Sequence, residues 1–345
     1  MTENQDYREP EYPRIHADAM FGREGKPYRA DPGLLAAANA ALALEMPLLL
    51  TGEAGCGKTD CAYAVASALA GDPEVEPGSE ALLECYVRSD SRAQDLLYRY
   101  DALSRFGDAS HGGPAGATRA QEVRHYIELK DLGRALMSPG LRVVLIDEID
   151  KAPRDLPNDL LRELDQGHFE IPEIPADAKI DERDRLIDPD DPLTFRDRMC
   201  RPAGARKPMV IITSNVERQL PDPFLRRCVF YHIPFPSAAA LRTILQDRFP
   251  GMPLLDHALA IFQTLRQVPN LTKRPTTSEL INWVQALARV FHEDAVQRAF
   301  AGFPESASAG VSPAGLPWGG LPGLGCLVKL REDLDRLGVA PGSGV

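Results

Sequence analysis

A glycine-rich stretch at residues 52–59 constrains the fold of this 345-residue chain more than any other feature. Its sequence, Gly52-Glu53-Ala54-Gly55-Cys56-Gly57-Lys58-Thr59, fits the pattern G-x-x-x-x-G-K-[ST] of a phosphate-binding loop. Leucines at 48–50 predict a short buried strand before it, and apolar residues recur at helical spacing after it, as far as Gly71. This order of strand, loop and helix predicts an α/β domain. Backbone N–H groups and a helix N-terminus would face a bound phosphate there.

Individual positions in this stretch have expected chemical roles. The Lys58 ammonium is expected to reach the β- and γ-phosphates of a nucleotide, and the Thr59 hydroxyl to bind Mg²⁺. The residues expected to surround the nucleotide are Gly52, Glu53, Ala54, Gly55, Cys56, Gly57, Lys58, Thr59 and Asp60. Cys56 is either a filler at a variable position or an oxidation-sensitive thiol. A chance glycine-rich turn is the alternative to the whole assignment, and the flanking strand and helix argue against it.

Two acidic residues end a second apolar run, about ninety residues after the glycine-rich stretch. The run 142–148, RVVLIDE, predicts a buried strand that ends in Asp147 and Glu148. In open α/β sheets, ligands bind at the carboxyl ends of the strands. Asp147 is therefore expected to hold Mg²⁺ through water, and Glu148 to orient and polarise the water that attacks the nucleotide. Ordinary loop acids are the alternative, which the position behind a phosphate loop disfavours.

Composition limits the class of protein and its surroundings. The chain is 44% hydrophobic, as globular proteins are, and no apolar run approaches the ~20 residues of a membrane span. The polar N-terminus lacks the apolar region of a signal peptide, so we expect a cytoplasmic protein with no membrane attachment. Six scattered cysteines suggest neither a disulfide framework nor a zinc site, which leaves Mg²⁺ as the expected metal. A net charge of −11 argues against a large nucleic-acid surface.

The remaining patterns predict the order of parts along the chain. We expect an irregular lead-in at 1–30, an α/β domain at 31–235, a helical part at 236–300 and a Gly/Pro-rich tail with a short helix at 301–345. A stretch at 175–207 is unusually charged and is either a functional insertion or a solvated loop.

Within these parts, further elements follow from periodicity. Strands are expected at 81–87, 209–215 and 228–233, and helices at 31–44, 93–100, 129–137, 156–165, 222–227, 237–248, 254–267 and 277–299. A glycine-rich loop is expected between 100 and 129, and Thr276-x-x-Glu279 predicts a capping box for the last helix.

Five motifs occur in an order that resembles AAA+ ATPases. They are residues 52–59, Leu145-Ile146-Asp147-Glu148, Thr213-Ser214-Asn215, Phe224-Leu225-Arg226-Arg227 and Lys273-Arg274-Pro275. More narrowly, PLLLTGE at 47–53, YRYDALSRF at 98–106 and LIDEIDK at 145–151 are similar to the MoxR-like branch. The resemblance implies a P-loop NTPase αβα sandwich with a five-stranded parallel sheet and a small all-helical lid. It also implies insertions near 93–130 and 168–207, and a homo-oligomeric ring, commonly a hexamer.

The resemblance also implies roles for residues outside the phosphate loop. Asn215 would take the sensor-1 role, bonding the attacking water or the γ-phosphate. Arg274 would be the sensor-2 arginine of the lid, with Lys273 as a rival. Arg227 or Arg226 would be the arginine finger that one subunit supplies to the next. For each of these cations, a surface salt bridge or helix-end charge is the alternative.

The expected function follows from these roles. The resemblance implies an Mg²⁺-dependent ATPase that remodels or matures a protein substrate, in some relatives through a partner with a von Willebrand A domain. A nucleic-acid motor or restriction-type GTPase on the same fold is one alternative, which the net charge disfavours. A nucleotide-gated scaffold with little turnover is another, which the presence of Lys58, Asp147, Glu148 and Asn215 disfavours.

Overall fold

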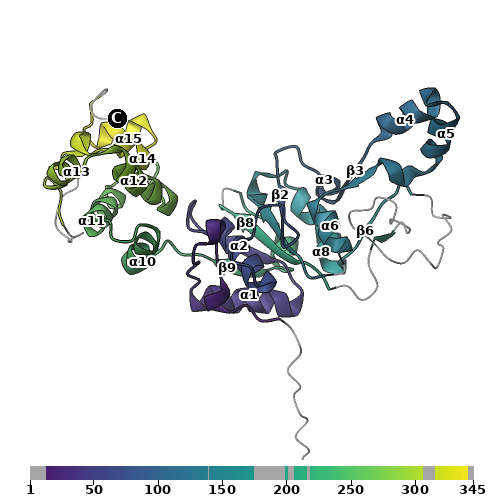
Figure 1. The fold of residues 1–345 in the computed structure, drawn as a ribbon, viewed down its shortest axis with the longest axis horizontal. Helices are drawn as coiled ribbons and strands as arrows, with labels where there is room; N and C mark the ends of the chain where they lie inside the picture. The colour runs from purple at the N-terminus through teal and green to yellow at the C-terminus, as the bar shows by residue number, and fades with distance from the viewer. Residues whose placement is uncertain are drawn as a thin grey trace, which may run out of the picture. The chain divides into compact units, whose positions relative to one another are not determined.

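The computed structural model describes residues 13–138, 140–174, 199–200, 206–215, 218–305 and 315–340. Within these ranges the chain divides into two compact units. The N-terminal unit comprises residues up to 51 and residues 58–232. The C-terminal unit comprises residues from 233 onward, together with 52–57 of the glycine-rich stretch. Figure 1 shows the ribbon of the chain with its elements labelled. Most of the charged stretch 175–207 lies outside the described residues.

A five-stranded parallel sheet forms the centre of the N-terminal unit, in the order β2-β5-β8-β1-β9. Its strands are β1 Leu48–Thr51, β2 Leu82–Tyr86, β5 Val143–Asp147, β8 Met209–Ser214 and β9 Val229–His232. The three inner strands are buried along their whole length except at Asp147. Near-continuous burial is what a parallel strand needs when helices cover both of its faces. The sheet is the one that the resemblance implied.

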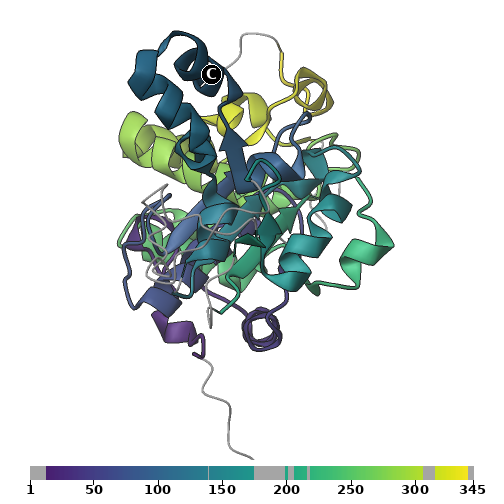
Figure 2. The same ribbon diagram turned by 90° about the vertical axis from the view of Figure 1, so that its right-hand side faces the viewer.

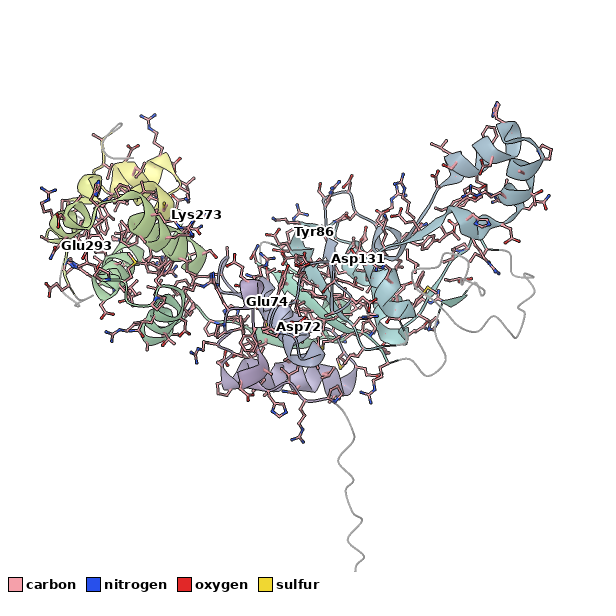
Figure 3. All side chains as sticks on the ribbon, in the orientation of Figure 1. Asp72, Glu74, Tyr86, Asp131, Lys273 and Glu293 are labelled. Carbon is pink, nitrogen blue, oxygen red and sulfur yellow. The ribbon has the colours of Figure 1, made fainter. Side chains whose placement is uncertain are left out.

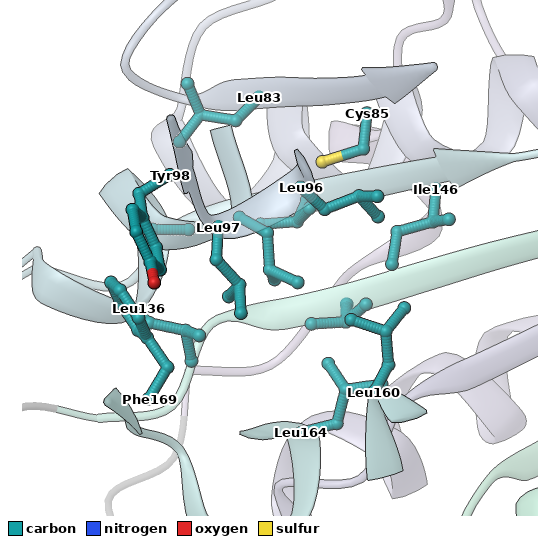
Figure 4. Packing of buried hydrophobic residues seen from close by; sticks show 14 of the residues in the cluster. Leu83, Cys85, Leu96, Leu97, Tyr98, Leu136, Ile146, Leu160, Leu164 and Phe169 are labelled. Atoms are coloured by element: carbon teal, nitrogen blue, oxygen red, sulfur yellow. The ribbon is translucent and has the colours of Figure 1, made fainter. Parts of the chain in front are cut away.

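Helices cover the two faces of this sheet. α1 Pro32–Leu44 and α2 Lys58–Ala70 lie on one face: Tyr231 of β9 donates to Asp31, the N-cap of α1, and Tyr63 of α2 donates to Glu84 of β2. In Figure 2, α1 is viewed nearly along its axis, beside the sheet. The other face is covered by α3 Ala93–Leu97, α6 Asp131–Met137, α7 Leu156–Asp159 and α8 Leu161–Gln166. Figure 4 shows Leu83, Cys85 and Ile146 of that face against side chains of these helices.

The segment 98–129 differs from the expected helix end and glycine-rich loop. It contains β3 Tyr98–Tyr100, α4 Ala102–His111, α5 Gly113–Gln121, η3 Val123–Tyr126 and β4 Ile127–Leu129. β3 and β4 pair antiparallel, and Figure 1 shows α4 and α5 side by side beyond this ribbon. Asp101 caps α4 by accepting from the Ser104 N–H, and Pro114 occupies the first turn of α5, so local capping starts both helices despite the glycines inside them.

Short elements complete the N-terminal unit. They are η1 Ala17–Ala19, η2 Arg23–Gly25, η4 Ile149–Lys151, β6 Phe169–Glu170, β7 Met199–Cys200 and α9 Asp222–Leu225. β6 pairs antiparallel with β7, with Phe169 opposite Cys200 and Glu170 opposite Met199. Across the described part of the chain, no helix is both long enough and apolar enough to cross a membrane.

Helices form the C-terminal unit. They are α10 Ala238–Arg248, α11 Leu255–Arg266, α12 Thr277–Val290, α13 Glu293–Phe300, η8 Trp318–Gly320, α14 Leu324–Leu327 and α15 Arg331–Arg336. The capping box of α12 is confirmed, because Thr276 and Glu279 each accept from the other's backbone N–H. The single helix expected at 277–299 is wrong: extended backbone at Phe291 and His292 separates α12 from α13.

Residues 315–340 pack as an integral part of this unit. Trp318, Leu321, Leu324 and Leu327 are at least 98% buried and share one hydrophobic core with α11 and α12. The Trp283 indole of α12 donates to the Pro322 carbonyl at 2.8 Å. Full burial of one large apolar side chain is worth about 1.5–3 kcal/mol, so this tail stabilises the helices that it contacts.

Candidate nucleotide site

The glycine-rich stretch connects β1 to α2 and has a backbone that only glycine accommodates. Gly57 has φ +94°, a value that side-chain-bearing residues rarely adopt. A Cβ on Gly52 would lie 2.5 Å from the Ile233 carbonyl oxygen, a distance that real Cβ atoms do not tolerate. Lys58, which begins α2, is 6% exposed. The loop thus has the bare backbone, helix N-terminus and adjacent cation that a phosphate group requires.

Three oxygen-bearing side chains meet beside the start of α2. The Thr59 hydroxyl donates to Asp147 Oδ1 at 3.2 Å, and the Thr213 hydroxyl donates to the same oxygen at 2.5 Å. Thr213 is wholly buried in β8, and Asp147 is the last residue of β5. The structure therefore brings the two expected magnesium ligands together, and adds a third group that the sequence interpretation had placed in a motif without giving it a role.

Glu148 occupies an unusual backbone position one residue later. Its φ of 55° and ψ of 50° lie in the left-handed region, at a cost of about 1–3 kcal/mol for a non-glycine residue. The Glu148 N–H donates to the Thr213 hydroxyl at 2.9 Å, and Asn215 Nδ2 donates to Glu148 Oε1 at 3.3 Å. Lys151 forms an ion pair with the other carboxylate oxygen. The strained turn thereby directs the carboxylate toward Asn215.

The backbone of Asn215 is itself anchored. Its N–H donates to the Asp150 carboxylate at 3.2 Å, and Asp150 is 3% exposed. Asp150 lies in the LIDEIDK sequence, but its partner, the Asn215 N–H, depends on how β5 and β8 align, which the sequence alone does not give. Glu148, expected to polarise the attacking water, and Asn215, to which the resemblance gives the sensor-1 role, lie within hydrogen-bond distance of each other.

A buried carboxylate lies on edge strand β2, which pairs with β5, the strand that leads into Asp147 and Glu148. These two residues are called the acid pair below. Glu84 is 7% exposed and accepts hydrogen bonds from the hydroxyls of Tyr63 on α2 and Tyr86 on β2. Tyr86, labelled in Figure 3, is the register partner of Asp147. Burial of the ring, followed by its hydrogen bond to Glu84, raises the pKa of Tyr63 to about 12. This network ties the phosphate-loop helix to the edge of the sheet next to Asp147.

The remaining loop residues have separate environments. Glu53 forms an ion pair with Arg266 at 2.9 Å, within the C-terminal unit. Cys56 is 7% exposed, and Ala54 is exposed. The Asp60 carboxylate, on α2, lies 3.9 Å from the Arg23 guanidinium.

The donor atoms at this cluster suit Mg²⁺. A hydroxyl and a carboxylate are hard oxygen ligands, and Mg²⁺ is commonly held by one or two carboxylates together with substrate phosphates. Thr59 and Asp147 are therefore the residues that would hold the ion.

The arginines Arg226 and Arg227 lie at the edge of the sheet where the strands begin, called the amino edge below. The acid pair lies at the opposite, carboxyl edge. The two arginines lie between α9 and β9, whose first residue, Val229, is opposite Leu48 at the start of β1. Asp147 and Asn215 lie at the carboxyl ends of parallel strands, so the length of a strand, about 13 Å for four residues, separates the two groups. Both arginines are exposed, and the Arg227 guanidinium lies 3.8 Å from the Asp165 carboxylate. The structure does not bring either arginine to the acid pair of its own chain.

Lys273 and Arg274 precede α12 in the C-terminal unit, where Figure 3 labels Lys273. The Lys273 ammonium lies 3.6 Å from Glu279 of α12. Arg274 is exposed, and no hydrogen bond or ion pair joins its side chain to another described residue of that unit. Of the two rivals, Arg274 is thus the one whose guanidinium is available to a ligand.

The phosphate loop, the acid pair at the carboxyl edge and the parallel sheet together define a P-loop nucleotide-binding protein. The chain matches the AAA domain, dynein-related subfamily, over residues 47–228, more than half of its length. It therefore belongs to the AAA domain family, whose members bind nucleotide and support ATP-driven activity.

Among solved structures, the chain is similar to the AAA domain of FIGL-1 in complex with ADP, with 15% identity and a TM-score of 0.35. That match covers 76% of this chain and 66% of the other, so this chain spans slightly less than two thirds of that structure. None of the curated proteins compared with the chain matches it.

Proposed function

We propose that this protein is an Mg²⁺-dependent ATPase of the MoxR-like branch that uses hydrolysis to remodel or mature a partner protein. The observation that carries the proposal is the placement of the Glu148 carboxylate. It lies beside Asn215 and one residue from the Thr59–Asp147 pair, where a base for water would be needed.

The chemistry of each residue follows from its place. Lys58 and the loop N–H groups would bind the phosphates, and Thr59 and Asp147 would hold the metal ion. When bound, Mg²⁺ neutralises charge on the β- and γ-phosphate oxygens. Glu148 accepts a proton from the attacking water, and Asn215 orients the Glu148 carboxylate through their hydrogen bond. Arg274 is the proposed lid contact to the phosphates.

We propose further that Arg227, or Arg226, completes the site of a neighbouring subunit in a homo-oligomeric ring. The position of both residues at the amino edge of the sheet supports this, because it keeps them away from the acid pair of their own chain. The ring, a hexamer in the proposal, and a partner with a von Willebrand A domain rest on the MoxR-like sequence motifs.

Two variants test the ATPase proposal. Glu148→Gln keeps the shape of the side chain but lacks a basic oxygen, so it should bind ATP normally and hydrolyse it about 10²–10⁴-fold more slowly. Lys58→Ala, the matched loss-of-binding variant, should lose affinity for ATP, because the phosphate charge then lacks its cation. Steady-state phosphate release and equilibrium ATP binding measure the two effects. Hydrolysis by Glu148→Gln within about twofold of the parent would remove Glu148 from this role.

The same Glu148→Gln protein also tests the proposed substrate class. Held in the ATP state, it should retain a protein partner on affinity capture, identified by mass spectrometry. Tight, salt-sensitive binding of DNA by the ATP-bound protein would instead favour the nucleic-acid motor.

A further inference from the structure

The C-terminal helix α15 contains a carboxylate that is wholly removed from solvent. Asp333, in the first turn of α15, is 0% exposed. A buried carboxylate is strongly disfavoured unless hydrogen bonds and a counter-charge compensate it. Arg336, one turn later, supplies the counter-charge through Nη1 at 2.8 Å. The other partners of Asp333 lie about sixty residues earlier in the chain.

Those partners are two consecutive backbone N–H groups. Thr272 N–H donates to Oδ1 of Asp333 at 2.7 Å, and Lys273 N–H donates to Oδ2 at 3.0 Å. Arg336 also donates to the Thr272 hydroxyl at 2.5 Å, so both members of the ion pair form hydrogen bonds to the same peptide segment. Hydrogen bonds to an ionised acceptor are roughly twice as strong as neutral ones, and two parallel bonds also fix orientation.

The segment that Asp333 and Arg336 bind has no regular secondary structure. Residues 271–276 lie between the end of α11 and the start of α12 and belong to neither helix. At the far end of the segment, Arg266 donates to the Pro275 carbonyl at 2.5 Å, and the capping box of α12 fixes Thr276. Asp333 thus supplies at 272–273 the hydrogen-bond partners that a helix or strand would otherwise supply.

The next residue in this segment is Arg274. The Lys273 side chain is turned toward Glu279, while Arg274 is exposed and lacks a partner among the described residues of the C-terminal unit. The backbone is fixed on both sides of Arg274. Little conformational entropy is therefore lost when the Arg274 guanidinium binds a ligand.

We propose that Asp333 is a positioning residue that holds residues 272–273 so that Arg274 is ready to contact the phosphates of a bound nucleotide. The inference rests on the proposed function, because it takes Arg274 as the phosphate contact. It gives the tail after residue 315 a role in nucleotide recognition as well as in packing.

Asp333→Asn tests the proposal, with Asp335→Asn as its matched control. Asn keeps the size of the side chain but lacks the charge and one acceptor. The Asp335 carboxylate, on the same helix, is exposed and forms no hydrogen bond or ion pair with another described residue. In nucleotide-free protein, hydrogen exchange at Thr272 and Lys273 should rise about tenfold or more in Asp333→Asn and stay unchanged in Asp335→Asn. Unchanged exchange in Asp333→Asn would overturn the proposal.

Nucleotide affinity provides the second readout. With a non-hydrolysable ATP analogue, Arg274→Ala should raise Kd about 10–100-fold, the usual effect of losing hydrogen bonds to a charged group. Asp333→Asn should raise Kd by a smaller factor, and it should add nothing in the Arg274→Ala background, because it acts through Arg274. Independent, multiplying effects, or an Arg274→Ala protein with unchanged Kd, would overturn the proposal.

Leu327→Ala controls for general destabilisation of the tail. Leu327 is 99% buried in the hydrophobic core of the C-terminal unit, whereas the N–H groups of Thr272 and Lys273 donate to Asp333. At a temperature where both variants are folded, its Kd should match that of the parent. An equal rise of Kd in Leu327→Ala and Asp333→Asn would show a merely structural effect and overturn the positioning role. Failure of the ATPase proposal is separate: it appears as absent hydrolysis in the parent protein and an unchanged Kd in Lys58→Ala.

Discussion

At the residue scale, one buried hydroxyl organises the acid pair. Thr213 donates to Asp147 and accepts from the Glu148 N–H, so a single oxygen sets both the carboxylate that would hold the metal ion and the backbone of the proposed base. The hydrogen bond that Thr213 accepts from the Glu148 N–H also stabilises the left-handed backbone at Glu148. Valine has the same shape as threonine but cannot make either bond.

Thr213→Val should therefore lower kcat of ATP hydrolysis more than it weakens ATP binding. A buried donor left without a partner costs about 1–3 kcal/mol, equivalent to roughly 5–150-fold in kcat if it displaces Glu148. Steady-state kinetics and thermal unfolding measure the two consequences. Thr213→Ser, which keeps the hydroxyl, is the control and should stay near the parent. Equal kcat values for Val and Ser would show that this hydroxyl does not set the position of Glu148.

At the element scale, helix α2 is joined to strand β2 by the Tyr63–Glu84 hydrogen bond. The pKa of Tyr63 in the folded protein, raised to about 12, exceeds that of a free tyrosine. A raised pKa means that the folded state favours the neutral phenol. The resulting stability is fully present below about pH 10, and it is lost as the pH rises through about 12.

The prediction concerns the difference between the parent and Tyr63→Phe, which removes the titrating group. Between about pH 10 and pH 12 the parent should lose more of its free energy of unfolding than Tyr63→Phe does. Urea midpoints measured in steps of pH give this difference, and the other tyrosines cancel because both proteins contain them. Parallel pH curves for the two proteins would contradict the raised pKa.

The sequence predicts elements well where burial imposes a pattern. The runs at 48–50, 142–148 and 209–215 became β1, β5 and β8, because a strand covered on both faces must be apolar throughout. Helices α4 and α5 were missed because they bury almost nothing. A helix without a buried face has no apolar residues recurring at helical spacing, so its sequence does not predict it. The glycines at 107 and 116 indicated a loop instead.

The candidate site was likewise predictable only in part. Asp147, Glu148 and Asn215 end apolar runs, so parallel pairing alone places them at one edge. The partners Thr213, Asp150 and Asp333 depend on strand register and on where the tail packs. No local pattern encodes such long-range contacts, which is why the residues that hold the site were found only in the structure.

At the scale of the whole molecule, the sheet separates two kinds of charged group. The acid pair lies at its carboxyl edge, and Arg226 and Arg227 lie at its amino edge. Under the proposed function, each catalytic site therefore needs two chains. Mixing two inactive variants tests this directly.

Lys58→Ala and Arg227→Ala should each lack ATPase activity, and mixing them should restore part of it. An interface between the intact loop of an Arg227→Ala subunit and the intact finger of a Lys58→Ala subunit is complete, and random mixing makes about a quarter of interfaces of this kind. Arginine fingers are worth about 10³–10⁵ in rate, so the recovered phosphate release should stand far above background. Arg226→Ala in place of Arg227→Ala identifies which arginine acts. Background activity in a preparation shown to exchange subunits would contradict a shared site.

The separation of the two edges also has an arithmetic consequence for assembly. In an open row of n chains, the phosphate loop at one end receives no arginine from a neighbour, and the arginine at the other end reaches no phosphate loop. The row therefore completes n − 1 sites. Closing the row into a ring adds the missing site without any further chain. A single chain completes none. The turnover per chain would then report the state of assembly, rising with concentration as rows lengthen and reaching its ceiling only when they close.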